Sequence, residues 1–373
     1  MNPANRTIAN LDILVKALPQ KSNRLFQRIF SLNTTKGCLK PPATMLPWIE
    51  QHFGSVDRVT EQKIIKVTNL VTYEGAIFNS LRALRPRQLE DRLRVEARLV
   101  DRAKDDPLSK PLEDTPEDIF GRIQGKYCIT ASNIAKYDGL HDMIIFRDHN
   151  PLAFDREKII DYLDTGWKWA QKANKFDPSA KYYFFLWNSL KKAGASLGHG
   201  HAQVVLSRGH HYAKIEALRH AALHYKAENR SDYFDDLYQI HLDLGLAVEK
   251  GGIRVLAYLT PIKEKETMLL SPGLNRSFKE RLYEVLACFR DCMHVTAFNV
   301  GIAVPPLNSL PKGWKDFPVI ARIVDRGYPW DGSSDFGTME LYAASIISSD
   351  PFQVARELKE ALAIRTKKKR GGK

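Results

Sequence analysis

The segment from Asn188 to Gln203, which reads NSLKKAGASLGHGHAQ, carries the residues best suited to chemistry. The apolar run Val204–Leu206 follows this segment directly, so the sequence predicts a β-strand that begins at the histidines and continues through the run. Because side chains of a strand alternate between two faces, His199, His201 and Gln203 share one face. The preceding glycines let backbone N–H groups approach an anion closely. An imidazole nucleophile beside such a cradle indicates phosphoryl or nucleotidyl transfer.

Strands and a long helix surround this segment and would have to position it. Patterns rich in β-branched and aromatic residues predict three strands before it, at 127–132, 142–147 and 181–187. Helical spacing of apolar residues at 154–174 predicts a helix between the last two strands, with Asp155 as a suitable N-cap. A fourth strand at 201–207 follows the glycine-rich loop.

The second half of the chain repeats this order in coarse form. Its predicted elements are helices at 211–228, 232–248, 277–294 and 350–364, and strands at 252–260, 296–306 and 318–326. Strands and a long helix in similar order predict an α+β fold built from a duplicated unit with antiparallel sheets. The expected divisions are an N-terminal arm at 1–60, a half with the active site at 61–210, a second half at 211–365 and a basic tail at 366–373.

Composition sets further bounds. The net charge of +13 over 373 residues favours an anionic partner, although a basic tail and solubility explain much of it. The four cysteines include no CxxC pair, as expected in a reducing compartment. The start lacks a signal-peptide pattern, and no stretch approaches the roughly 20 apolar residues that span a bilayer. We therefore expect a cytoplasmic protein without a membrane partner.

The region resembles the active site of the galactose-1-phosphate uridylyltransferases, which belong to the histidine-triad (HIT-like) superfamily. The resemblance is carried by residues 144–152 and 185–206. In that family an Asn, a Gly-x-Ser and an H-x-H-x-Q follow one another at similar spacing, and here these are Asn188, Gly194, Ser196, His199, His201 and Gln203. The resemblance implies a duplicated HIT-like fold, with antiparallel sheets flanked by helices.

The resemblance also implies roles for these residues. His201 would attack the α-phosphorus of a nucleotide and form a covalent nucleotidyl-histidine, while a backbone carbonyl holds its other ring nitrogen. Ser196 and Gly198 would donate to the phosphoryl oxygens, and His199 would orient the loop.

Asn188 and Gly194 would contact the substrate next to Ser196 and Gly198. Two more positions come from weaker likeness: Asn133 after 127–132 would hold the nucleoside, and Glu340 within 336–343 would lie near a sugar phosphate.

Gln203 distinguishes transfer from hydrolysis. HIT hydrolases place a third histidine there, which can protonate a leaving group and later serve water. An amide does not titrate near neutral pH, so it can hold a phosphoryl oxygen but cannot shuttle a proton. Gln203 therefore favours a transferase.

The sequence departs from the family pattern in three ways. Gly200 stands where a transferase often has Pro, and the second half reads IARIVDR where some members have another H-x-H. Some members hold zinc with a CxxC pair and two histidines. His149 and His199 match those histidines, but only the isolated Cys38 lies upstream. Because structural zinc takes four ligands, the sequence does not support a zinc site, and the mechanism requires no cofactor. Without zinc, His149 either supports a residue of the active site without contacting substrate or begins a turn.

These observations predict a nucleotidyltransferase that moves a nucleoside monophosphate between a nucleoside diphosphate sugar and a hexose 1-phosphate. UMP is the nucleotide that we expect. The alternative within the same chemistry is a dinucleoside polyphosphate phosphorylase, whose acceptor is phosphate. A third hypothesis is a non-catalytic nucleotide- or RNA-binding protein that uses the basic charge. The H-x-H-x-Q pattern argues against this hypothesis, because binding alone requires neither a nucleophile nor an amide, and we do not expect a nucleic-acid partner. A homodimer is compatible with the resemblance.

Overall fold

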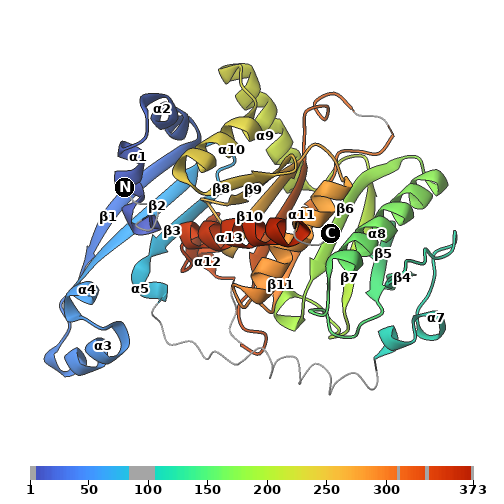
Figure 1. Cartoon of the computed structure of the whole chain (residues 1–373), viewed down its shortest axis with the longest axis horizontal. Coiled ribbons are helices and arrows are strands. Elements are labelled where there is room, and N and C mark those ends of the chain that lie inside the picture. The colour runs from blue at the N-terminus through green and yellow to red at the C-terminus, as the bar shows by residue number, and fades with distance from the viewer. Residues whose placement is uncertain (1–5, 84–105, 309–310, 332–335, 371–373) are drawn as a thin grey trace.

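The computed structural model describes residues 6–83, 106–308, 311–331 and 336–370. Its largest element is a nine-stranded sheet with the strand order β4-β5-β7-β6-β11-β12-β10-β9-β8, in which every neighbouring pair is antiparallel. Figure 1 shows this sheet running through the body of the molecule, with a smaller sheet at one side.

The first half of the large sheet contains the predicted strands and helix. Its elements are β4 (Cys128–Ser132), β5 (Leu140–Phe146), α8 (Arg156–Phe176), β6 (Ala180–Asn188) and β7 (His201–Arg208). The side chain of Asp155 accepts a hydrogen bond from the backbone N–H of Lys158, so the predicted N-cap is confirmed.

The second half repeats the first half in the reverse strand order. Its elements are β9 (Ile253–Ala257), β10 (Glu264–Ser271), α11 (Arg276–Asp291), β11 (Phe298–Ala303) and β12 (Val319–Asp325). Outward from the β6–β11 junction, β7, β5 and β4 on one side correspond to β12, β10 and β9 on the other. The predicted α+β duplication with antiparallel sheets is therefore confirmed.

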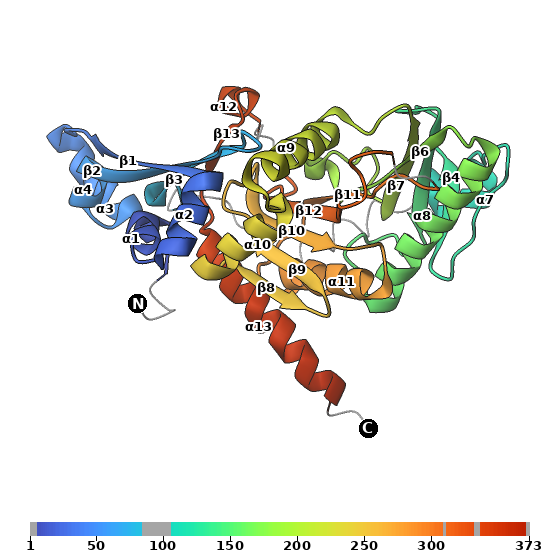
Figure 2. The same ribbon diagram turned by 90° about the horizontal axis from the view of Figure 1, so that it is seen from above.

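Helices α8, α11 and α13 (Pro351–Arg370) cover one face of the large sheet, as Figure 2 shows. The packing under α8 is close: a Cβ on Gly166 would lie 2.7 Å from the Tyr183 hydroxyl and 3.1 Å from a methyl group of Val204. Val204 therefore faces the helices. The strand alternation then places His201 and Gln203 on the opposite face of the sheet.

Helices α9 (Ala213–Asn229) and α10 (Tyr233–Leu244) follow β7, and β8 (Ala247–Lys250) completes the sheet edge. Tyr225 is the one fully buried side chain of α9, whereas α10 buries half of its residues. Helix α9 thus lies over the second half with most of its surface in solvent.

The N-terminal region differs from the expected arm of helix and loops. It contains α1 (Leu11–Lys16), α2 (Gln20–Ile29) and β1 (Phe30–Cys38), which pairs with β2 (Glu61–Asn69). Strands β1 and β2 form a four-stranded sheet with β3 (Gly75–Asn79) and β13 (Ala344–Ile347). The division expected at residue 61 therefore falls between the paired strands β1 and β2. The composition hid β1, because its sequence FSLNTTKGC is mostly polar and exposed.

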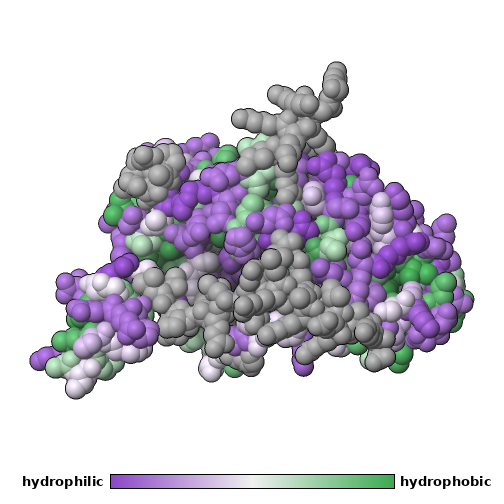
Figure 3. All heavy atoms as spheres, turned by 60° about the horizontal axis from the view of Figure 1, so that its bottom comes forward, coloured by the Kyte–Doolittle hydropathy of each residue, from purple (hydrophilic) through white to green (hydrophobic). Residues whose placement is uncertain are grey.

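Helices α3 (Leu46–Phe53) and α4 (Val56–Thr60) connect β1 to β2 and form a projecting lobe, on which Figure 3 shows apolar and polar atoms mixed. The remaining short helices are α5 (Ser80–Ala83), α7 (Pro111–Asp114) and α12 (Thr338–Leu341). Helix α13 continues to Arg370, into the stretch expected as a tail. Among the described residues, no helix has the length and apolar character to cross a membrane.

One carboxyl group is buried in the first half against another. Asp142 on β5 is 1% exposed, and Asp118 lies within hydrogen-bond reach of it. Burial, and then the hydrogen bond and charge of Asp118, raise the pKa of Asp142 to about 9. The folded state therefore holds a proton on this group at neutral pH that the unfolded chain releases.

We expect Asp142→Asn to flatten the dependence of stability on pH. Because the folded pKa of Asp142 is raised, its stabilising contribution is complete below about pH 4 and is lost as pH rises through about 9. Urea denaturation between pH 5 and 9 should show this decline in the unaltered protein but not in the variant. The exposed Asp57→Asn serves as the control, and an equal decline in all three proteins would contradict the assignment.

Candidate active site

His201 is the first residue of β7 and is held by its own neighbour. Its Nδ1 lies 2.8 Å from the carbonyl oxygen of His199, and a carbonyl can only accept, so Nδ1 carries the proton. The lone pair is then on Nε2. Burial lowers the pKa of His201, which is 7% exposed, and this favours the neutral ring. A neutral imidazole with a fixed tautomer is suited to act as a nucleophile.

The His199 side chain ties the loop to the end of β5. Its Nε2 donates to the carbonyl oxygen of Phe146 at 2.9 Å. Its Nδ1 lies 3.1 Å from a carboxylate oxygen of Asp106 and 3.2 Å from Nδ1 of His149. Both ring nitrogens of His199 are thus engaged by protein groups, which leaves the ring no lone pair for a substrate and fits a role in orienting the strand entry.

Gln203 is oriented by a histidine that the sequence analysis did not identify. His141 on β5 accepts at Nδ1 from the backbone N–H of Tyr137 at 2.9 Å, so its Nε2 donates to the Gln203 Oε1 at 2.8 Å. Asn133 Nδ2 lies 3.4 Å from the same oxygen. The structure thus brings Asn133 close to Gln203. Because both contacts are to Oε1, the Gln203 NH₂ group can donate a hydrogen bond to a substrate.

Strand alternation could have identified His141 in the sequence. His141 and Met143 share one face of β5, and Met143 pairs with Gln203 in the adjacent strand. The register between β5 and β7 was the missing information, because it is fixed only when the sheet assembles.

A second missed residue, Asn299, supports the glycine-rich loop from the other half. Asn299 on β11 donates from Nδ2 to Asn188 Oδ1 and to the carbonyl oxygen of Ala193, both at 2.7 Å. Gly194 follows with a φ of 99°, which favours glycine. The loop that carries the expected phosphate contacts is therefore fastened across the β6–β11 junction.

The remaining predicted residues fall in two places. Ser196 and Gly198 lie exposed on the loop that leads to His199. Glu340 lies in α12, where it contacts Lys263 Nζ at 3.7 Å and accepts from the backbone N–H of Gly337. It lines a cavity over the second half of the sheet, rather than joining His201.

Asp106, His149 and His199 place three ligand-type atoms within 4.8 Å of one another. Because His199 donates from Nε2, its neutral form directs a lone pair at the Asp106 carboxylate, and two acceptors face each other unless a proton or a cation lies between them. That Asp106 oxygen is buried and makes no hydrogen bond within the described part of the chain. The set fits a cation but supplies three of the four protein ligands usual for structural zinc.

The structure explains Gly200. Its backbone N–H donates to the carbonyl oxygen of His149 at 2.8 Å, a bond that Pro could not make. A Cβ at this position would lie 2.7 Å from the ring of Phe146, 3.0 Å from the carbonyl oxygen of Asp148 and 3.2 Å from Pro151 Cα. Close approach of the 146–151 turn therefore requires glycine here.

We expect Gly200→Ala to destabilise the protein by about 1–3 kcal/mol, because the added methyl group must displace backbone atoms. Gly273→Ala is the matched control, since its Cβ would meet nothing within 4 Å. Urea denaturation compares the two variants. Equal midpoints would show that the turn yields freely and would refute the close fit.

The chain was also compared with known proteins. No family model and no curated protein matches the sequence. Solved structures do match. An ADP-glucose phosphorylase from Arabidopsis thaliana is 16% identical, with 78% of this chain and 96% of that chain covered and a TM-score of 0.59. A GalT-like protein from the same plant is 15% identical, with 69% and 92% covered and a TM-score of 0.56.

A uridylyltransferase is 14% identical, with 79% of this chain and 98% of that chain covered and a TM-score of 0.54. The chain has the uridylyltransferase fold. The match extends over 96% and 98% of those two solved chains, so the fold is shared over almost their whole length. At these identities the likeness establishes the fold alone, and the activity must be argued from the site.

Proposed function

We propose that this protein is a nucleotidyltransferase that works through a covalent nucleotidyl-His201. The observation that carries this proposal is the bond from His201 Nδ1 to the His199 carbonyl oxygen, which leaves the Nε2 lone pair as the reactive position. A buried histidine with a merely structural role would have no need of a glycine-rich loop and an oriented amide on its face.

The first step transfers the nucleotide to the protein. His201 Nε2 attacks the α-phosphorus of a nucleoside diphosphate sugar, a P–N bond forms, and the P–O bond to the sugar phosphate breaks. The sugar phosphate leaves with the electron pair of that bond. Ser196 and Gly198 on the exposed loop would donate to the non-bridging oxygens, where negative charge concentrates. A phosphate acceptor then attacks the same phosphorus and releases His201, which gives ping-pong kinetics.

Gln203 favours transfer over hydrolysis in this scheme. His141 occupies its Oε1, so the NH₂ group is available to donate to a phosphoryl oxygen. Neither orientation of an amide can remove a proton from water. The nucleotidyl intermediate would therefore persist until a phosphate acceptor arrives.

The substrate pair is a finer proposal. UMP transfer between a UDP-sugar and a hexose 1-phosphate is the first choice, since the residue pattern resembles that family. ADP-glucose, the ligand of one structural neighbour, is the second donor to test. A dinucleoside polyphosphate with phosphate as acceptor is the third. Asn133 and the loop around Asn188 lie where base and phosphate specificity would be set.

We expect the protein, mixed with UDP-glucose and no acceptor, to gain the mass of one uridylyl group. The P–N bond should make this adduct labile to acid. His201→Ala should abolish the adduct, because it removes the Nε2 lone pair that attacks phosphorus, and the exposed His224→Ala should retain it. Intact-protein mass spectrometry measures all three.

The same assay is repeated with ADP-glucose and diadenosine tetraphosphate. The donor that gives the fastest adduct identifies the nucleotide. An adduct that persists in His201→Ala, or no adduct with any donor, would refute the mechanism. In the latter case, nucleotide or RNA binding that falls steeply with salt would favour the non-catalytic hypothesis.

The proposed mechanism needs no cofactor. If a divalent cation binds, Asp106, His149 and His199 would hold it, and it would fix the turn and the strand entry. His201 is not among these ligands, and its Nε2 is free of this role.

We therefore expect chelation to leave adduct formation intact. After treatment with EDTA the protein should still gain the nucleotidyl mass, and Asp106→Asn should behave in the same way. A fall in the melting temperature on chelation would indicate a structural ion, because a ligand of the native state stabilises it. Loss of the adduct that zinc restores would show that the cofactor-free mechanism is wrong.

A further inference from the structure

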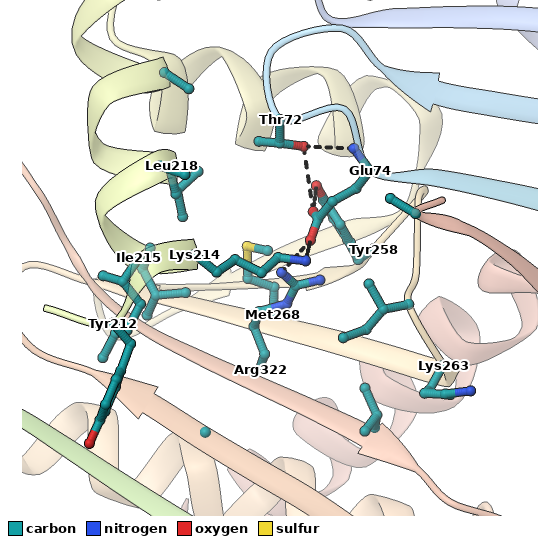
Figure 4. A pocket seen from close by; sticks show the side chains of 18 of the residues that line it. Thr72, Glu74, Tyr212, Lys214, Ile215, Leu218, Tyr258, Lys263, Met268 and Arg322 are labelled. Atoms are coloured by element: carbon teal, nitrogen blue, oxygen red, sulfur yellow. Dashed lines mark hydrogen bonds and ion pairs between the residues drawn. The ribbon is translucent and has the colours of Figure 1, made fainter. Parts of the chain in front are cut away.

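A cavity of about 950 Å³ lies over the second half of the large sheet, between its open face and α9. Ile215 and Leu218 of α9 line it from above, and Met268 and Arg322 line it from the sheet, as Figure 4 shows. Neither His201 nor Gln203 lines this space. Its size is within the range of small-molecule sites, which is about 300–1,000 Å³.

The sheet register makes this cavity the counterpart of the active site. In the first half Gln203 pairs with Met143 on one side and Leu186 on the other. In the second half Arg322 pairs with Met268 and Gly301 in the same two directions. Arg322 therefore occupies the position of Gln203 in the duplicated unit.

The neighbouring positions correspond as well. His141 and Glu266 each lie two residues before the paired methionine. The backbone N–H of Asn133 donates to the His141 carbonyl oxygen at 3.1 Å, and that of Tyr258 donates to the Glu266 carbonyl oxygen at 3.0 Å.

Side chains repeat the relation. His141 holds Gln203 by a hydrogen bond, and Glu266 holds Arg322 by an ion pair. The positions of His141 and Gln203 are thus occupied by polar groups in the second half as well, although both residue types differ.

The nucleophile has no counterpart there. His201 is two residues before Gln203, and Ile320 is two residues before Arg322. Ile320 lines the cavity and has no lone pair. A nucleotide bound in this half would therefore stay intact.

The centre of the cavity holds a network of buried charges. Glu74 is 4% exposed and contacts Arg322 Nη1 at 2.6 Å and Lys214 Nζ at 2.7 Å. The Tyr258 hydroxyl donates to its second oxygen at 2.9 Å. Burial alone would raise the pKa of Glu74, but the two cations lower it to about 2, so the carboxylate is charged.

The lining leaves a donor and positive charge for a ligand. Arg322 Nη2 is buried without a hydrogen-bond partner in the described part of the chain. Four basic side chains and two carboxylates line the cavity, namely Lys214, Lys263, Arg322, Arg326, Glu74 and Glu340. Glu266 also pairs with Arg322 from behind the wall, so four cations face three carboxylates, and the remaining positive charge suits an anionic group.

Most of the remaining wall is apolar and includes aromatic rings, among them Phe184, Phe234 and Phe317. Such rings suit a flat, aromatic ligand body. An anionic group and an aromatic body together describe a nucleoside phosphate.

We propose that this cavity is a second, non-reacting nucleotide site that binds a nucleoside monophosphate or diphosphate. The inference rests on the proposed function, since the equivalence matters only if the first half binds nucleotide. Arg322 lies three strand spacings from Gln203, or about 14 Å, so the two sites are separate. Asn299 lines the cavity and also holds Asn188, and this contact would couple the two sites.

Calorimetric titration of the full chain with UMP, and separately with AMP, tests the proposal. These probes carry no leaving group on the α-phosphorus, so binding is measured without adduct formation. We expect two equivalents to bind. Ala221→Trp, which fills the cavity from α9, should weaken one of them by at least about tenfold, a change of about 1.4 kcal/mol. Ala227→Trp, exposed on the same helix and outside the cavity, should retain both.

Lys214→Glu provides a second variant that does not depend on packing. The Lys214 side chain is 62% exposed, so its reversal removes little apolar packing, but it takes one of the two cations from Glu74 and should weaken the same equivalent. Affinities that both variants leave unchanged would overturn the proposal. The adduct assay with UDP-glucose reports on His201 separately. Failure of that assay would refute the proposed function even where the two cavity variants lower nucleotide binding.

Discussion

The antiparallel pairing of β6 with β11 is the contact on which the structure depends. It joins a unit of four strands to a unit of five strands in one continuous nine-stranded sheet. It also places Asn299 opposite Asn188, so the loop before His199 is fastened by a side chain from the other unit. Sheet continuity and loop geometry are therefore one constraint, and the glycine-rich loop would lose its anchor if the halves separated.

The two units use the same scaffold for different chemistry. In the first unit, His201 and Gln203 lie on the same face of β7. The His199 carbonyl oxygen fixes the tautomer of His201, and His141 fixes the orientation of the Gln203 amide. In the other, an isoleucine and an arginine occupy those positions, and two carboxylates surround the arginine. The backbone hydrogen bond that Asn133 donates to His141 is repeated between Tyr258 and Glu266, while the side chains diverge. The fold thus separates what holds the sheet together from what the sheet presents.

The sequence predicted the parts that depend on local pattern. Apolar periodicity and an N-cap located α8, and β-branched runs located β5, β6 and β7. It missed β1, because polar residues occupy a strand whose faces are mostly exposed. It identified His201 and Gln203 from spacing, but His141, Asp106 and Asn299 join them only through register and loop approach. Those relations arise between segments far apart in the chain, and no short window contains them.

The bond that fixes the His201 ring begins and ends within three consecutive residues. The strand entry that sets its geometry is held in turn by the contacts of His199 and Gly200 with the 146–151 turn, which also belongs to the first half. A gene duplication that builds a protein on this plan can change one copy extensively while the nucleophile in the other copy stays aimed. Drift in the second copy would be limited chiefly at Asn299 and the strand that carries it, which makes the altered half a tolerant place for new binding properties to arise.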